Sequence, residues 1–181
     1  WPQAAYNINE DEFLVVWEDY RNDLQSSGLA DIWGQFVKAD GTLRGENFPV
    51  CEAANPQWWP HLDYDPVSDR YLIVFEDYRT GDGNIYGIFV SGQGDLITIP
   101  SSEADGSFPI CDVEGGIYAP SVSFNYREGR YLVVWGDYRT SQNWGLQDIY
   151  GQLLDHEGNL LVVGSGKALR KTQSLEGFPV A

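Results

Sequence analysis

The sequence predicts an all-β protein made of repeated four-stranded antiparallel units, and three observations lead to this prediction. A run of β-branched and aromatic residues occurs three times, as FLVVWEDYR, YLIVFEDYR and YLVVWGDYR, starting at Phe13, Tyr71 and Tyr131. Each run is apolar on both of its alternating faces, which is typical of a strand covered from both sides. The starts lie 58 and 60 positions apart, and such self-similarity indicates a repeat architecture.

The first strand of each unit is expected before the apolar run. Pro2, Pro60 and Pro120 each lie 11 positions ahead of the aromatic residue that opens the run. A short loop of Asn, Asp, Gly and Glu separates the two segments. Two extended segments joined in this way predict a hairpin.

Two further segments complete each unit. The third segment reads DIWGQ, NIYGI or DIYGQ, and the fourth reads FPVC, FPIC or FPVA. A glycine lies six positions after each third segment, at Gly41, Gly94 and Gly158, and we expect it to close a second hairpin. The distance from this glycine to the fourth segment varies, as is typical of loops. Each unit therefore has four short strands.

Units of this kind bury both faces best when they stack radially, as the blades of a β-propeller. We expect one repeat domain with blades at residues 1–51, 52–111 and 112–181. Propellers usually have about 4 to 8 blades, and an open arc would leave two apolar faces in water. We therefore expect two chains to form a six-bladed ring, while a piece of a longer array and an unusual closure of three units are the alternatives.

The motifs above resemble the propeller-type repeats of large secreted and surface proteins of bacteria and archaea, and the resemblance covers essentially the whole chain. It implies an extracellular or cell-surface module without catalytic activity. The absence of Met and the start at Trp1 further lead us to expect a processed or excised piece.

Composition excludes some partners. The chain carries 27 acidic and 11 basic side chains, with a formal net charge of -16, which repels a phosphate backbone or an anionic membrane. No apolar run approaches the roughly 20 residues of a membrane span. We expect no nucleic-acid partner and no membrane insertion.

A recurring Asp is the candidate metal ligand. It occurs at Asp19, Asp77 and Asp137, each two positions before an Arg. Carboxylate oxygens suit calcium, so calcium is the candidate cofactor. The alternative is structural, with an Asp that ties a turn and an Arg that bridges neighbouring blades. Recurrence in all three units favours the structural role, because a site is needed once and a fold-specifying contact is needed in every unit.

The two cysteines leave alternatives open. Cys51 and Cys111 hold equivalent positions, and Ala181 takes the same place in the third unit. A disulfide requires Cα atoms within roughly 7 Å, which equivalent positions on adjacent blades meet only close to the axis. A small buried residue is therefore favoured over a disulfide.

The candidate ligand-binding residues are the tryptophans Trp58, Trp59 and Trp144. Trp58 and Trp144 break the repeat, and we place these two in connecting loops. Exposed Trp suits a sugar ring or a protein interface, although these side chains could instead cover blade edges. The motifs GxSxG and HExxH are missing, which disfavours an enzyme. We expect a carbohydrate-binding, lectin-like module that forms a homo-oligomer. The alternatives are a glycoside hydrolase or lyase fragment and a structural subunit of an extracellular fibre or surface layer.

Overall fold

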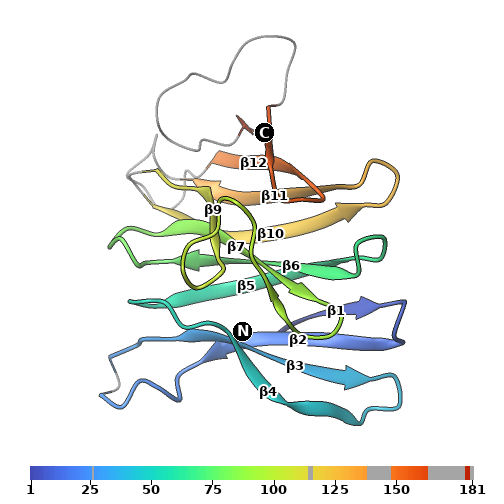
Figure 1. Cartoon of the computed structure of the whole chain (residues 1–181). Helices are drawn as coiled ribbons and strands as arrows, with labels where there is room; N and C mark the ends of the chain where they lie inside the picture. The colour runs from blue at the N-terminus through green and yellow to red at the C-terminus, as the bar shows by residue number, and fades with distance from the viewer. Residues whose placement is uncertain (26, 114–115, 138–147, 163–177, 180–181) are drawn as a thin grey trace.

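The computed structural model describes residues 1–25, 27–113, 116–137, 148–162 and 178–179. Within these residues the chain is all β, with no helix and therefore none that could span a membrane. The strands form three antiparallel sheets in chain order (Figure 1). The prediction of an all-β fold built from three antiparallel units is thus confirmed.

The first sheet has the strand order β1-β2-β3-β4. Its strands are β1 (Gln3–Asn7), β2 (Glu12–Asp19), β3 (Asp31–Lys38) and β4 (Leu43–Cys51). The second sheet consists of β5 (Gln57–Asp65), β6 (Arg70–Asp77), β7 (Asn84–Ser91), β8 (Leu96–Ile97) and β9 (Phe108–Cys111). The third consists of β10 (Ile117–Asn125), β11 (Arg130–Asp137), β12 (Asp148–Asp155), β13 (Leu160–Leu161) and β14 (Phe178–Pro179).

The outer strand differs from the prediction in two of the three sheets. The sequence predicts one fourth strand in each unit, and β4 is such a strand. In the second sheet, β8 and β9 both pair with β7, and in the third, β13 and β14 both pair with β12. The prediction of a single fourth strand is wrong there, because the longer stretch between the glycine turn and the Phe-Pro pair divides the strand into two pieces.

The hairpin turns explain the polar residues that recur between strands. The side-chain oxygens of Asn7, Asp65 and Asn125 each accept two backbone N–H bonds from the turn that follows. Such Asx turns are a property of Asn and Asp. The second hairpins close at Gly41 and Gly94, whose φ angles of 84° and 99° lie in the left-handed region. This conformation costs glycine little.

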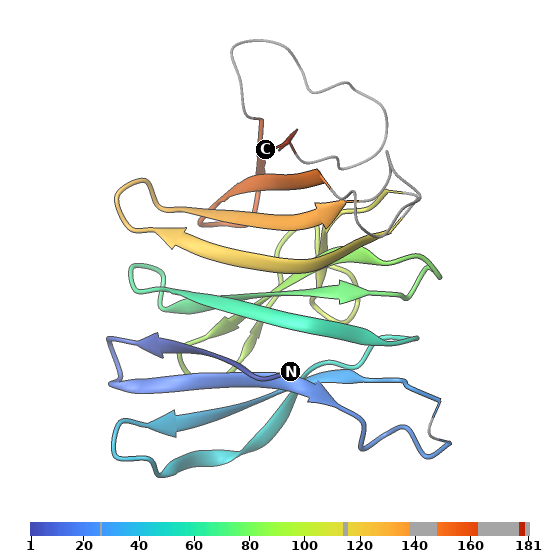
Figure 2. The same cartoon turned by 180° about the vertical axis from the view of Figure 1, so that it is seen from behind.

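The three sheets lie face to face in succession (Figures 1 and 2), and each junction contains one hydrophobic core. Leu14 from β2 and Ile73 from β6 belong to the core between the first two sheets. Leu72 from β6 and Val133 from β11 belong to the core between the second and third. Because neighbouring side chains of a strand point to opposite faces, β6 supplies both cores.

The two end sheets correct another expectation. Along β6 every residue from Tyr71 to Asp77 is buried, but Phe13 of β2 is 38% exposed and Leu132 of β11 is 36% exposed. The prediction that each copy is covered on both sides therefore holds only for the middle sheet. Within the described residues the first and third sheets each have one open face, and the three sheets do not close a ring.

Candidate functional site

A hollow at the junction of the first and second sheets gathers four aromatic side chains around one carboxylate. It has a volume of about 260 Å³ and is lined by Trp1, Glu18, Tyr20, Trp58 and Trp59. We refer to it as the tryptophan pocket. Trp1 precedes β1, Glu18 and Tyr20 lie at and just after the end of β2, and both other tryptophans lie near the start of β5. The start of β1 meets the end of β2 because the two strands pair antiparallel, and β5 packs against both across the junction.

A β-bulge places Trp59 in this pocket. The pairing of β5 with β6 shifts between Trp58 and His61, and Trp59 has a φ angle of 56°. A bulky side chain is rare in the left-handed region, and bulges commonly redirect a side chain. The same bulge occurs in β10, where Ala119 has a φ angle of 51°. The bulge is thus shared by β5 and β10, while the residue at this position is Trp59 in β5 and Ala119 in β10.

Glu18 fixes the geometry of the pocket. Its Oε1 accepts a hydrogen bond from the backbone N–H of Trp59 at 2.8 Å, and its Oε2 accepts one from the Tyr20 hydroxyl at 3.3 Å. Burial, together with the charge of Glu18, raises the pKa of Tyr20. The rings of Trp1 and Trp59 lie 5.0 Å apart at 36°, and these residues are 64% and 41% exposed. The pocket therefore offers flat apolar surface to solvent beside a hydrogen-bonding carboxylate.

The equivalent position at the next junction is closed. Glu76 accepts a hydrogen bond from the backbone N–H of Ala119 and one from the Tyr78 hydroxyl, just as Glu18 does from Trp59 and Tyr20. Glu76 is only 2% exposed, and this burial raises its pKa to about 7. One structural device thus occurs twice, and only its first copy opens to solvent.

The structure brings together two of the three tryptophans that the sequence singles out. Trp58 and Trp59 line the same pocket, while Trp144 lies outside the described residues. Both residues belong to strand β5, so the placement of Trp58 in a connecting loop is wrong. The bulge explains how Trp59 lines the pocket although it belongs to a strand, because β5 continues beyond the bulge.

Sequence reasoning missed three lining residues, Trp1, Glu18 and Tyr20. Each has a counterpart in the second unit, at Trp59, Glu76 and Tyr78, and recurring residues are most simply read as structural. A signal was nevertheless present. Trp1 is the repeat equivalent of Trp59, a residue already singled out, and this equivalence places two indole rings at corresponding points of adjacent sheets.

The recurring Asp residues bind their neighbouring Arg. Asp77 accepts hydrogen bonds from the backbone N–H and the guanidinium of Arg79 at 2.7–2.8 Å. Asp19 accepts the same set from Arg21 at 2.6–2.9 Å, and these bonds hold the pKa of the Asp19 carboxyl well below its usual value. Asp137 is buried, and the Arg that follows it lies outside the described residues. In Asp19 and Asp77 the carboxylate oxygens are thus already engaged by a cation from the chain itself.

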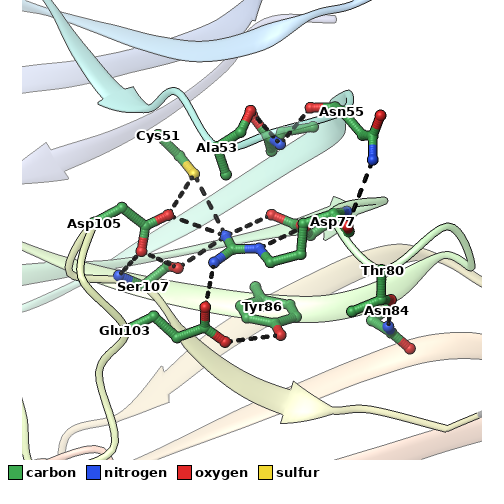
Figure 3. Close-up of polar contacts among 12 residues, drawn as sticks. Cys51, Ala53, Asn55, Asp77, Thr80, Asn84, Tyr86, Glu103, Asp105 and Ser107 are labelled. Carbon is green, nitrogen blue, oxygen red and sulfur yellow. Dashed lines mark hydrogen bonds and ion pairs between the residues drawn. The ribbon is translucent and has the colours of Figure 1, made fainter.

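The surroundings of Arg79 show what this cation does (Figure 3). Its guanidinium lies 3.0 Å from a Glu103 oxygen, 3.1 Å from an Asp105 oxygen and over the ring of Tyr86 at 4.2 Å. All three residues belong to the second unit, and the contact across the junction is the one to Cys51 Sγ at 3.8 Å. Arg79 makes its ion pairs within its own sheet, because the inserted segment between β8 and β9 supplies the carboxylates, and its bridge to the neighbouring sheet is the contact to Cys51. Among the described residues no group of His, Cys, Asp and Glu is arranged to hold a metal ion.

Cys51 and Cys111 lie in different cores and are both buried thiols rather than a disulfide. Burial raises the pKa of the Cys51 thiol well above its ordinary value. A thiol in this state is protonated and inert, so Cys51 acts as a small packing residue.

Comparison with known proteins gives no family. No family model matches the chain, and no curated protein matches it. Similar solved structures include a protein described as TolB from Agrobacterium tumefaciens, with a TM-score of 0.46 and 20% identity over 87% of this chain and 46% of that one. Another is an endo-arabinase from Bacteroides thetaiotaomicron VPI-5482, with a TM-score of 0.48 and 14% identity over 90% of this chain and 61% of that one. The chain thus spans 46% and 61% of the lengths of these two proteins.

Proposed function

We propose that this chain is an extracellular, non-catalytic binding module that holds a saccharide in the tryptophan pocket. The observation that carries the proposal is the exposure of Trp1, Tyr20 and Trp59 around a hollow that contains the Glu18 carboxylate. Sugar rings present an apolar face that stacks on an indole, and hydroxyl groups that donate to a carboxylate. The resemblance of the repeat motifs to those of secreted and surface proteins supports the extracellular setting.

The size of the pocket narrows the ligand. Its volume of about 260 Å³ lies just below the roughly 300–1,000 Å³ of pockets for drug-sized molecules. One sugar ring fits this space, with further residues of an oligosaccharide extending into solvent. Trp59 supplies the stacking surface, and its backbone is fixed from below by Glu18. Because this hydrogen bond holds the Trp59 backbone before the ligand binds, binding does not have to order the stacking surface.

The same geometry argues against glycoside hydrolysis. The usual mechanism needs two carboxyl groups, about 5 to 10 Å apart, on either side of the scissile bond. Among the described residues that line the pocket, Glu18 is the single carboxylate. Its two oxygens already accept hydrogen bonds from Trp59 and Tyr20. Glu18 is therefore suited to orient a ligand.

The proposal includes the arrangement of the three sheets as blades of a β-propeller. Support comes from their face-to-face succession and from the position of their first strands, since β1 lies beside β5 and β5 lies beside β10. In a propeller the blades surround a central channel, and first strands that neighbour one another fit the position next to it. The tryptophan pocket would then lie near the inner rim, where two blades meet.

The test is a glycan-array screen, followed by titration of the best saccharide with tryptophan fluorescence as the readout. We expect Trp59→Ala and Trp58→Ala each to weaken binding at least about tenfold, equivalent to 1.4 kcal/mol. Tyr126→Ala is the matched control, because Tyr126 is a 67% exposed aromatic residue on the third sheet that does not line the pocket. It should bind as the unmodified chain does.

Two outcomes would overturn the proposal. One is the absence of binding to any saccharide on the array, or binding that survives both Trp substitutions. The other is sustained release of reducing ends from polysaccharides, abolished by Glu18→Gln, which would replace the binding module with a glycoside hydrolase.

A further inference from the structure

The two open faces of the stack are complementary to each other. The first open face belongs to β1 and β2 and carries Tyr6, Phe13, Val15 and Trp17, which are exposed or half-buried. The second open face belongs to β11 and β12 and carries Leu132, Val134, Ile149 and Leu153, which are exposed or half-buried as well. We infer that the first open face of one chain packs on the second open face of another copy, in two identical junctions that close a ring of six sheets.

The two junctions inside the chain show which faces of the sheets pack on each other. At each junction, the face of one sheet that points toward the following sheet packs on the face of that sheet that points back toward the preceding one. The interface is therefore always formed by two different faces. Leu72 of β6 occupies the same repeat position as Leu132, and it is fully buried at such a junction. Tyr71 occupies the same position as Phe13 and is also fully buried. Each open face is thus the counterpart of a surface that the fold already buries.

Each of the three sheets carries an aromatic pair on the face equivalent to the first open face, which in the second and third sheets is the face toward the preceding sheet. The rings of Tyr64 and Tyr71 lie 4.8 Å apart in the second sheet, and those of Phe124 and Tyr131 lie 4.7 Å apart in the third. The corresponding rings of Tyr6 and Phe13 in the first sheet lie 5.1 Å apart. The pairs of the second and third sheets are buried in the junction cores, whereas the pair of the first sheet is exposed to solvent.

One residue of the preceding sheet contacts each buried pair. Phe36 lies 6.1 Å from Tyr71, and Phe89 lies 5.9 Å from Tyr131, between ring centres. The repeat places Leu153 at this position in the third sheet. Leu is smaller than Phe, and a hollow of about 290 Å³ lies beside Leu153 and Leu132. This hollow has room for the aromatic pair of the first open face.

Charge favours the same arrangement. At the first junction Asn9, in the β1–β2 turn, donates a hydrogen bond to the Tyr64 hydroxyl at 2.8 Å. In the third sheet the residue at the Asn9 position is Arg127, which is exposed. The residue at the Tyr64 position in the first sheet is Tyr6, whose hydroxyl donates to Asp11 at 2.7 Å. A copy docked as the internal junctions prescribe would therefore bring Arg127 to the Asp11 carboxylate.

The number of copies follows from the geometry of closure. Chains of three sheets can form rings of three, six or nine, and six is the member of this series within the range of about 4 to 8 blades. A heterologous contact that closes on itself gives a finite ring, and one that does not close gives a filament. The inference rests on the blade arrangement proposed above and not on the ligand.

The test is the solution mass of the full chain by sedimentation velocity, with two single-face variants. The unmodified chain should sediment at twice its mass of 20.3 kDa. Phe13→Glu breaks the first open face and Leu132→Glu breaks the second, and each should raise the dissociation constant at least a hundredfold. A mixture of the two variants should pair again through its one intact junction. Val67→Glu, in an 80% exposed turn position, should leave the mass unchanged.

Several results would overturn the inference. A monomeric unmodified chain would remove the interface, and open-ended growth would remove the ring. If the dimer formed through two first open faces, or through two second open faces, one of the single-face variants would stay fully dimeric. Mixing the two variants would then not increase the fraction of dimer. Near-ultraviolet circular dichroism of each variant shows that it is folded. Leu132→Glu lies away from the tryptophan pocket and should keep any saccharide binding, so the two proposals fail separately.

Discussion

The second sheet and its two neighbours carry nearly the same central strand, yet only the second buries it completely. Leu72 of β6 is fully buried, while Leu132, its equivalent in β11, is 36% exposed. The two residues have the same side chain and the same position in the repeat. Burial in a repeat protein is therefore decided by what stacks on each face, as is expected when every unit contacts only its neighbours.

The Asp–Arg pairs show the same contrast. The Arg79 side chain is 12% exposed and that of Asp77 is fully buried, whereas the Arg21 and Asp19 side chains are 40% and 12% exposed. The inserted segment of the second sheet adds Glu103 and Asp105 around Arg79. One sequence motif thus forms a partly exposed pair in the end sheet and a more deeply buried pair, surrounded by further carboxylates, in the middle sheet.

The largest expected effect is the loss of this cluster. Arg79→Ala leaves the Asp77 carboxylate buried without its cation, and breaking a buried pair costs about 3–5 kcal/mol. Arg21→Ala is the matched variant, and its effect should be far smaller because water solvates the exposed pair. Urea denaturation of both variants measures the difference. Equal losses in the two variants would show that the insertion adds nothing to the pair.

The second effect compares the two equivalent leucines. Leu72→Ala opens a cavity in a closed core and should cost about 3 kcal/mol, since buried Leu→Ala changes cost 2–5 kcal/mol. Leu132→Ala should cost less than about 1 kcal/mol in the dissociated chain, because its side chain already contacts water. Denaturation at low protein concentration measures both. A large loss at Leu132 in the monomer would mean that other residues of the chain cover that face.

The sequence predicts most of the fold because its signals are local and repeated. The apolar runs fix the strands β2, β6 and β11, and the recurring Asn, Asp and Gly fix the turns. The division of the outer strand into β8 and β9 is not predictable in this way. It depends on residues 98–107, which have no repeat pattern and whose side chains act on Arg79 across the sheet.

The candidate site is predictable only in part. Trp58 stands out because it breaks the repeat, and it does line the pocket with Trp59. Glu18 does not stand out, since its counterpart Glu76 makes the same hydrogen bond in a closed junction. What separates the two is exposure, since Glu76 is buried and Glu18 is only partly buried. Repeat position alone predicts the bond, and only the packing of the adjacent sheets shows which copy is open.

The smallest effect is a pH dependence that arises from the buried Glu76. Burial raises the pKa of Glu76 from 4.5 to about 7, so the folded chain binds this proton more tightly than the unfolded chain does. The corresponding stability is fully present below pH 4.5 and is lost as the pH rises through about 7. At 1.36 kcal/mol per pKa unit, the loss amounts to at most about 3 kcal/mol, and water entering near Glu76 reduces it.

Glu76→Gln tests this directly, because the amide is neutral at every pH and its oxygen still accepts the bond from Ala119. Measured by urea denaturation between pH 4.5 and 8, the variant should gain stability relative to the unmodified chain as the pH rises. If the difference in stability between the variant and the unmodified chain stays constant over this range, burial does not raise the pKa of Glu76 as its closed junction implies.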